Sequence, residues 1–133
     1  MPNPSLPESN VDADLESVGL TRERAATVRR FATAVATGGV VLDASHALDA
    51  LVSGLCEIRG IGPWTAHYIA MRAGGERDAF PGADLGLRRA LGGGRPITVR
   101  ELERRAEFWR PWRAYAAVHL WAERARPLAT RWP

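Results

Sequence analysis

A short glycine turn, Gly60-Ile61-Gly62, followed at once by Pro63, constrains this chain more than any other feature. Glycine tolerates positive φ and leaves no side chain over the neighbouring amides, so the chain can turn sharply at both glycines. Proline is favoured at the first position of a helix, where its missing N–H costs nothing. The pattern therefore predicts a hairpin that runs directly into a helix N-terminus. The exposed amides and the positive end of the helix dipole would face the same way, which is typical of an anion site and suits a phosphate.

Apolar residues recur at helical spacing on both sides of this turn, and no stretch alternates as a strand would. Thr21, Asp43 and Thr98 are expected N-caps, and Thr98 forms a capping box with Glu101. The predicted helices cover, in order, Val11–Val18, Thr21 to the Gly38-Gly39 stop, Asp43 to about Leu55, Pro63 to about Ala73, Leu85–Leu91, Thr98 to about Trp109, and Pro111 to about Arg124, with Pro127 after it. The expected fold class is all-α, a compact helical bundle around the hairpin.

The length of 133 residues suits one domain with a modest core. Residues 1–10 contain three prolines and no helical periodicity, so we expect a loosely attached arm there and a single domain over 11–133. Cys56 is the only cysteine, which excludes an internal disulfide. The sequence has no export signal and no apolar run of membrane-spanning length, so a cytoplasmic protein without membrane attachment is expected.

All 18 basic residues are arginines. The planar guanidinium binds phosphate through two parallel hydrogen bonds and stacks on bases, so an arginine-rich surface is compatible with nucleic acid. A bias in genome composition explains the same pattern and is the preferred interpretation for any single exposed arginine. The arginines on the outer side of the Thr21 helix are interpreted as a solvated face.

Asp84 and an aromatic pair carry the chemistry that the sequence suggests. Asp84 precedes Leu85 at the start of a predicted helix, where an aspartate is a good N-cap with no further duty; a helix N-terminus also lowers the pKa of a carboxyl and keeps it charged. Trp64 and Tyr68 lie four residues apart and so share one side of the Pro63 helix. Such a pair belongs either to the core or to a ligand site.

Three parts of the sequence together resemble a known family. They are Leu55-x-x-Ile58-x-Gly60-Ile61-Gly62-Pro63-x-Thr65-Ala66, then Asp84 in Gly82-Ala-Asp-Leu-Gly-Leu, then Trp109-Arg-Pro-Trp112-Arg-x-Tyr115-Ala. In this order they resemble the helix-hairpin-helix DNA glycosylase superfamily, and most closely its bacterial 3-methyladenine DNA glycosylase II branch. The likeness runs from about Val18 to about Trp121.

The resemblance implies roles for individual residues. Asp84 stands at the position of the catalytic aspartate. The residues matching the pocket for the extruded base are Trp64, Tyr68 and Trp121, the last of which is equally compatible with a core role. Those matching the phosphate contacts are Arg59, Gly60, Ile61, Gly62 and Thr65. The family also binds a monovalent cation, Na⁺ or K⁺, through hairpin carbonyls that here belong to Cys56, Ile58 and Ile61.

The function implied is that of a monofunctional DNA N-glycosylase in base excision repair. It would extrude alkylated purines such as 3-methyladenine and 7-methylguanine from double-stranded DNA and hydrolyse their N-glycosidic bond with the help of Asp84. Some relatives also cut the strand with a lysine, but Trp64 occupies that position and the chain has no lysine. A lone cysteine likewise excludes the four-cysteine iron–sulfur cluster of other relatives. No cofactor is therefore required.

Two other functions stay open. Family members are longer, with a β-containing N-terminal domain and helices that carry an intercalating side chain, and we find no counterpart of these helices upstream of Val11. We therefore expect the domain to be truncated relative to the family, and either self-association or a partner that supplies the missing helices. One alternative is a non-catalytic helix-hairpin-helix module that binds DNA. The other is a small helical interaction protein in which all aromatic residues are core.

Two further interpretations do not depend on the function. Trp109 and Trp112 are interpreted as core residues. The three histidines, His46, His67 and His119, lack metal-ligand spacing, so a zinc site is not expected.

Overall fold

The computed structural model of this protein describes residues 13–43 and 46–125. Within these residues all regular structure is helical, which confirms the all-α prediction. The helices are α1 (Arg22–Ala36), α2 (Leu48–Cys56), α3 (Pro63–Arg72), α4 (Leu85–Leu91), α5 (Val99–Ala106), the short 3₁₀ helix η2 (Glu107–Trp109) and α6 (Arg113–Ala125). None of these helices is both long and apolar enough to cross a membrane.

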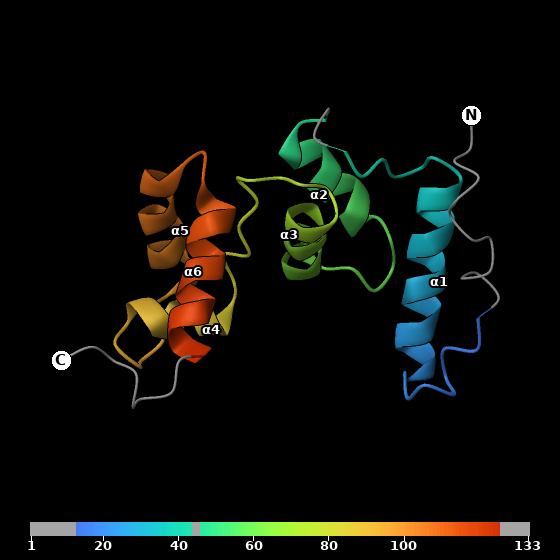
Figure 1. Ribbon diagram of the computed structural model, residues 1–133, viewed down its shortest axis with the longest axis horizontal. Helices are drawn as coiled ribbons and strands as arrows, with labels where there is room; N and C mark the ends of the chain where they lie inside the picture. Colours follow the sequence, from blue (N-terminus) through green and yellow to red (C-terminus); the bar gives the residue numbers. More distant parts are fainter. Residues whose placement is uncertain (1–12, 44–45, 126–133) are drawn as a thin grey trace.

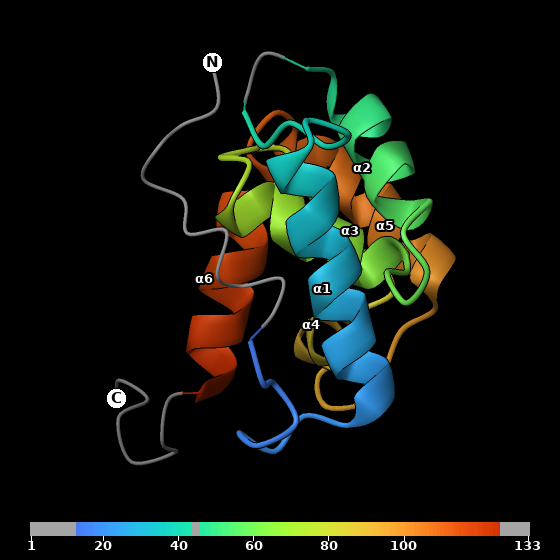
Figure 2. The same cartoon turned by 90° about the vertical axis from the view of Figure 1, so that its right-hand side faces the viewer.

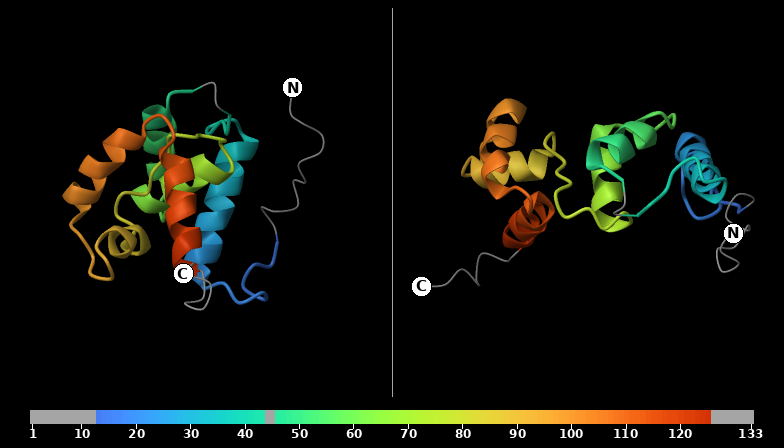
Figure 3. Two further views of the ribbon diagram at one scale, coloured as in Figure 1. Left: turned by 60° about the vertical axis from the view of Figure 1, so that its left-hand side comes forward. Right: turned by 90° about the horizontal axis from the view of Figure 1, so that it is seen from above.

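The helices gather in three groups along the longest axis of the molecule (Figure 1). At one end lies α1, in the middle lie α2 and α3, and at the other end lie α4, α5 and α6. The view from above in Figure 3 shows the same three groups in a row, and in Figure 2 α1 crosses in front of α3. The strongest packing joins α2 to α3 and α4 to α6.

Two hydrophobic clusters hold these groups together. The buried residues of the first are Val40, Leu51, Leu55, Ile61, Ala66, Ala70 and Ala79, with α1 side chains packed against them. The buried residues of the second are Phe80, Leu87, Leu102, Ala106 and Ala117. Ala79 and Phe80 are neighbours in the chain but belong to different clusters, while Met71 packs against both. The segment between α3 and α4 therefore crosses from one core to the other and ends at Asp84.

The predicted helix starts are largely as observed, because they depend on local chemistry. The hydroxyl oxygens of Thr21 and Thr98 accept the amides of Arg24 and Glu101, at 3.4 and 3.1 Å. Pro63 occupies the first turn of α3. These contacts confirm the helix starts that the sequence predicted for α1, α3 and α5.

Two predictions near the N-terminal side are wrong. The described part of the predicted 11–18 helix is a turn, in which the Ser17 amide and hydroxyl both bond to Asp14. Such side-chain bonds to nearby backbone compete with helix formation. Asp43 is not the N-cap of α2, since α2 begins at Leu48 after Ala47, and Asp43 instead bonds to the His46 ring.

The two tryptophans of the Trp109-Arg-Pro-Trp112 sequence have different environments. Trp109 packs edge-on against Phe80 in the second cluster, as predicted. Trp112 is 50% exposed, so its interpretation as core was wrong; its ring contacts Tyr115 and the guanidinium of Arg77. The predicted N-terminal arm over residues 1–10 and the stop at Pro127 lie outside the described residues.

Candidate active site

The Asp84 carboxylate receives hydrogen bonds from three different helices. As the N-cap of α4, its Oδ2 accepts the Leu87 amide at 2.8 Å. Oδ2 also accepts the indole N–H of Trp121, from α6, at 3.0 Å. Oδ1 accepts the indole N–H of Trp64, from α3, at 2.8 Å. The N-cap role and a second role for Asp84 are therefore compatible, because only one of the three donors belongs to the cap.

These donors favour the charged form of Asp84. Partial burial alone would raise its pKa, but the hydrogen bonds from Trp121, the Leu87 amide and Trp64 outweigh burial and hold the pKa of Asp84 below its ordinary value. The carboxylate is therefore negative at neutral pH and fixed in orientation. A fixed negative charge of this kind stabilises a positive charge that develops beside it.

Three aromatic rings lie beside this carboxylate. Trp64 and Tyr68 are stacked, with ring centroids 5.2 Å apart and planes 9° apart. The ring of Trp121 lies 6.1 Å from that of Tyr68, tilted by 53°. Trp64 is 40% exposed and so presents part of its ring to solvent. The structure thus brings together the three residues that the sequence assigned to a base pocket, although they come from α3 and α6.

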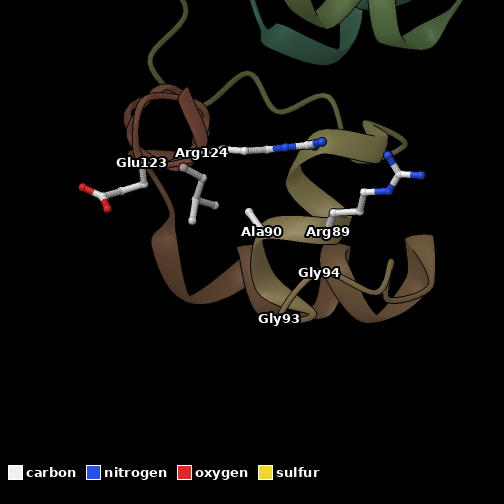
Figure 4. A pocket seen from close by; sticks show the side chains of 7 residues that line it. Arg89, Ala90, Gly93, Gly94, Glu123 and Arg124 are labelled. Carbon is white, nitrogen blue, oxygen red and sulfur yellow. The ribbon is translucent and has the colours of Figure 1, made fainter. Parts of the chain in front are cut away.

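A surface hollow of about 420 Å³ lies between α4 and α6 (Figure 4). It is lined by Arg89, Ala90, Gly93, Gly94, Leu120, Glu123 and Arg124, and by none of the residues that the resemblance assigned to a site. Its walls carry no aromatic ring, so it offers no stacking surface for a base. The aromatic group beside Asp84 is the better candidate for a ligand site.

The predicted glycine hairpin joins α2 to α3. Gly60 has a φ of 100°, and the Ile61 amide bonds to the Ile58 carbonyl at 3.0 Å while the Ile61 side chain is buried. Gly62, in contrast, is extended with a φ of −95°, so the expectation of positive φ at both glycines was wrong. Within the described part of the chain, no hydrogen bond occupies the amides of Gly60, Gly62 or Thr65. These amides are available to an anion at the start of α3.

Helix α1 braces this hairpin, a contact that sequence reasoning missed. The Arg30 guanidinium donates to the Arg59 carbonyl at 3.3 Å. The Thr27 hydroxyl lies 3.4 Å from the same carbonyl oxygen, and 3.0 Å from the Glu23 carbonyl of its own helix. A Cβ on Gly60 would lie only 2.0 Å from Thr27 Oγ1. Gly60 is therefore required both for its positive φ and for the close approach of α1. The Arg59 side chain remains exposed beside the turn.

A network of ion pairs fixes the segment that leads to Asp84, and no pattern in the sequence indicates it. The Asp78 carboxylate accepts Nε and Nη2 of Arg113, at 2.9 and 3.0 Å, and Nη1 of Arg110 at 2.8 Å. Partial burial would raise the pKa of Asp78, but hydrogen bonds from Arg113 and the charges of both arginines lower it. The Ala114 amide also donates to the Arg77 carbonyl at 2.9 Å. The segment is thereby tied to the start of α6, the helix that carries Trp121.

His67 ties the same segment to α3. Its Nδ1 accepts the Phe80 amide at 3.1 Å, so the ring is held in the tautomer with Nδ1 unprotonated. Burial, and then the positive charge of Arg113, lower the pKa of His67. Both residues missed by the sequence analysis, Asp78 and His67, thus position Asp84 between the two helices whose indoles bond to it.

Comparison with known proteins adds to this geometry. No family model matches the chain. Over 131 residues, 98% of its length, the chain is 38% identical to a Mycobacterium tuberculosis protein named probable bifunctional transcriptional activator/DNA repair enzyme AlkA. Over 107 residues it is 32% identical to DNA-3-methyladenine glycosylase 2 of Escherichia coli, a match that covers 80% of the chain. The chain spans 26% and 37% of the lengths of these two relatives.

A solved structure is similar over much of the fold. It is that of the Schizosaccharomyces pombe 3-methyladenine DNA glycosylase Mag1, in complex with abasic DNA. The two chains superpose with a TM-score of 0.73 and 25% sequence identity, and the match covers 86% of this chain and 60% of the other.

Proposed function

This chain is homologous over most of its length to the 3-methyladenine DNA glycosylases of the helix-hairpin-helix superfamily, and from this we propose that it is a monofunctional DNA N-glycosylase. The proposed substrate is an N-alkylated purine in double-stranded DNA, such as 3-methyladenine or 7-methylguanine. The proposed reaction is hydrolysis of the bond between that base and its deoxyribose.

One observation carries the proposal: a charged, oriented carboxylate is hydrogen-bonded to two tryptophans, and a tyrosine ring contacts both of them. As the base leaves, positive charge builds on the deoxyribose, and Asp84 would stabilise it and orient the attacking water. Both Asp84 oxygens are already anchored by N–H donors, so the carboxylate needs no rearrangement when the sugar arrives.

The aromatic rings suit a cationic base. N-alkylated purines carry a positive charge, and stacking on Trp64, Tyr68 or Trp121 adds cation–π attraction of about 0.5 to 2 kcal/mol. Tyr68 already has such a partner, because the Arg72 guanidinium lies 5.6 Å from its ring centroid. A cationic base is also a good leaving group, so the reaction needs little acid catalysis, and we assign no general acid.

The hairpin would hold the DNA backbone. We assign the phosphate contact to the free amides of Gly60 and Gly62, with Ile61 between them, helped by Thr65 and the Arg59 side chain. The carbonyls of Cys56, Ile58 and Ile61 are proposed ligands of a structural Na⁺ or K⁺. The Ile58 carbonyl accepts one hydrogen bond, from Ile61, and a carbonyl oxygen has a second lone pair for a cation.

Base release without strand cleavage is the test of this function. A duplex with one 7-methylguanine is incubated with excess protein or without protein, half of each sample is then treated with mild alkali, and breaks in the protein-free sample are subtracted. We expect breaks at the modified position only after alkali, because the chain has no lysine to form a Schiff base with the abasic sugar. Breaks without alkali would contradict monofunctional chemistry. Binding of the duplex with no release at all would support the non-catalytic DNA-binding alternative.

A further inference from the structure

Arg124 lies beside the Asp84 carboxylate without contacting it. A Cβ built on Gly86 would lie 2.9 Å from Asp84 Oδ2 and 3.2 Å from Arg124 Nη1, so both atoms border the same small space. Figure 4 shows the Arg124 side chain reaching from α6 to the first turn of α4, whereas its neighbour Glu123 points away. Gly86 makes this approach feasible, because any side chain there would fill the space between the two charged groups.

The N–H donors of the Arg124 guanidinium are available to a ligand. Within the described residues it takes part in no hydrogen bond or ion pair, and the residue is exposed. Asp84 does not use it either, since its oxygens accept three N–H groups from Leu87, Trp64 and Trp121. An arginine presents a planar fork of N–H donors that matches the oxygens of a phosphate.

We propose that Arg124 binds a phosphate of the nucleotide whose sugar lies at Asp84, an inference that rests on the proposed glycosylase function. If the deoxyribose sits against Asp84, its own 5′ and 3′ phosphates flank that sugar and are the anions nearest to Arg124. The leaving base is cationic and would be repelled by a guanidinium. A bound phosphate also neutralises Arg124, which would otherwise oppose the positive charge that develops on the sugar.

This contact is distinct from the one at the hairpin. The hairpin amides precede α3, whereas Arg124 is near the end of α6 and its side chain reaches α4 (Figure 4). The two contacts together would hold the strand on two sides of the extruded nucleotide. Arg124 would therefore be a substrate-binding residue of the active site, specific for the phosphodiester and not for the base.

The test uses a duplex that contains a tetrahydrofuran abasic-site analogue, so that binding is measured without base release. The phosphates around the analogue are replaced one at a time by neutral methylphosphonates, and dissociation constants are measured for wild type, Arg124→Gln and Arg100→Gln. Arg100 is an exposed arginine on α5 and gives the matched loss of one charge. We expect Arg124→Gln to bind about tenfold more weakly, with the slope of log affinity against log salt reduced by about 0.9.

The methylphosphonate series decides the assignment. For wild type and Arg100→Gln, one substitution next to the analogue should weaken binding, and for Arg124→Gln that substitution should have no further effect. Equal losses of affinity in Arg124→Gln and Arg100→Gln would overturn the phosphate contact, and so would an Arg124→Gln variant that responds to the methylphosphonate as wild type does. The glycosylase function would still stand in either case if wild type releases the base. Faster base release by Arg124→Gln would also overturn it, because Arg124 would then be restraining Asp84. A chain that binds no duplex would overturn both proposals.

Discussion

Two indole N–H groups, from Trp64 on α3 and Trp121 on α6, help to orient the Asp84 carboxylate and to lower its pKa. Each tryptophan therefore has two uses: its ring borders the proposed base pocket, and its N–H anchors the carboxylate. A substitution that keeps an aromatic ring but removes the N–H separates these uses.

Trp121→Phe should raise the pKa of Asp84. The folded-state pKa is depressed, so the carboxylate stabilises the fold above its unfolded pKa and loses that effect as pH falls through the folded value. Without the Trp121 donor this loss, and protonation of Asp84, should begin at higher pH. A ¹³C NMR titration of the Asp84 carboxyl measures this pKa.

Trp109→Phe is the control, because Trp109 packs on Phe80 and makes no bond to Asp84. Equal titration curves for wild type and Trp121→Phe would show that the Trp121 N–H does not lower the pKa of Asp84.

Gly86→Ala should reduce base release without unfolding the protein. Its Cβ would lie 2.9 Å from Asp84 Oδ2, so the carboxylate must shift. Alanine is otherwise favourable inside a helix, so α4 should survive. We expect single-turnover release to slow by about ten- to a hundredfold, since small misplacements of a catalytic group have effects of that size. Gly54→Ala on α2 meets no atom within 4 Å and should leave the rate unchanged; equal rates for all three proteins would count against a fixed carboxylate.

At the scale of elements, local chemistry made much of the structure predictable. Thr21, Pro63 and Thr98 mark helix starts because each acts on backbone within a few residues of itself. The failures also have local causes, as in the turn where Ser17 bonds back to Asp14. The brace of α1 on the hairpin was not predictable, because Thr27 and Arg59 lie far apart in the sequence and no periodicity records that they meet.

The two hairpin glycines should respond differently to alanine. Gly60→Ala forces a side chain into positive φ and against Thr27, so we expect a loss of about 2 kcal/mol or more in the free energy of unfolding. Gly62 is extended and its Cβ would meet no atom within 4 Å, so Gly62→Ala should fold normally. A methyl group beside the free amides should nevertheless weaken duplex binding. Urea unfolding and duplex titration measure the two effects, and loss of stability in Gly62→Ala would refute this assignment.

For the whole molecule, the site depends on how two hydrophobic cores are joined. Asp84 bonds to α3, which belongs to the first core, and to α6, which belongs to the second. The sequence could place Trp64, Tyr68 and Asp84 on their elements, and the family resemblance added Trp121. It could not show that Asp78 and His67 hold the connecting segment, because neither an aspartate in a loop nor a histidine inside α3 carries a pattern that identifies its partner.

Asp78→Asn should therefore loosen the junction. It removes the charge that binds Arg113 and Arg110, and hydrogen bonds to charged groups of this kind contribute about 2 kcal/mol to stability. The pKa of Asp78 is lowered in the fold, so the difference from wild type should be full above the unfolded pKa and should shrink as pH falls through the folded value. Thermal unfolding of wild type and Asp78→Asn at several pH values measures this difference in stability. Glu101→Gln, which disrupts only exposed pairs with Arg104 and Arg105, is the control; equal effects of both changes would argue against a special role for Asp78.

If Asp84 provides the proposed glycosylase activity, removing its negative charge alone should abolish base release. Single-turnover release of 7-methylguanine and 3-methyladenine from alkylated duplex DNA is measured for wild type and for Asp84→Asn. Asparagine is as good an N-cap as aspartate and similar in shape, so the variant should fold while lacking the negative charge. We expect release by wild type and loss of release in Asp84→Asn, with duplex binding retained. Equal release by both proteins, or none by either, would contradict it.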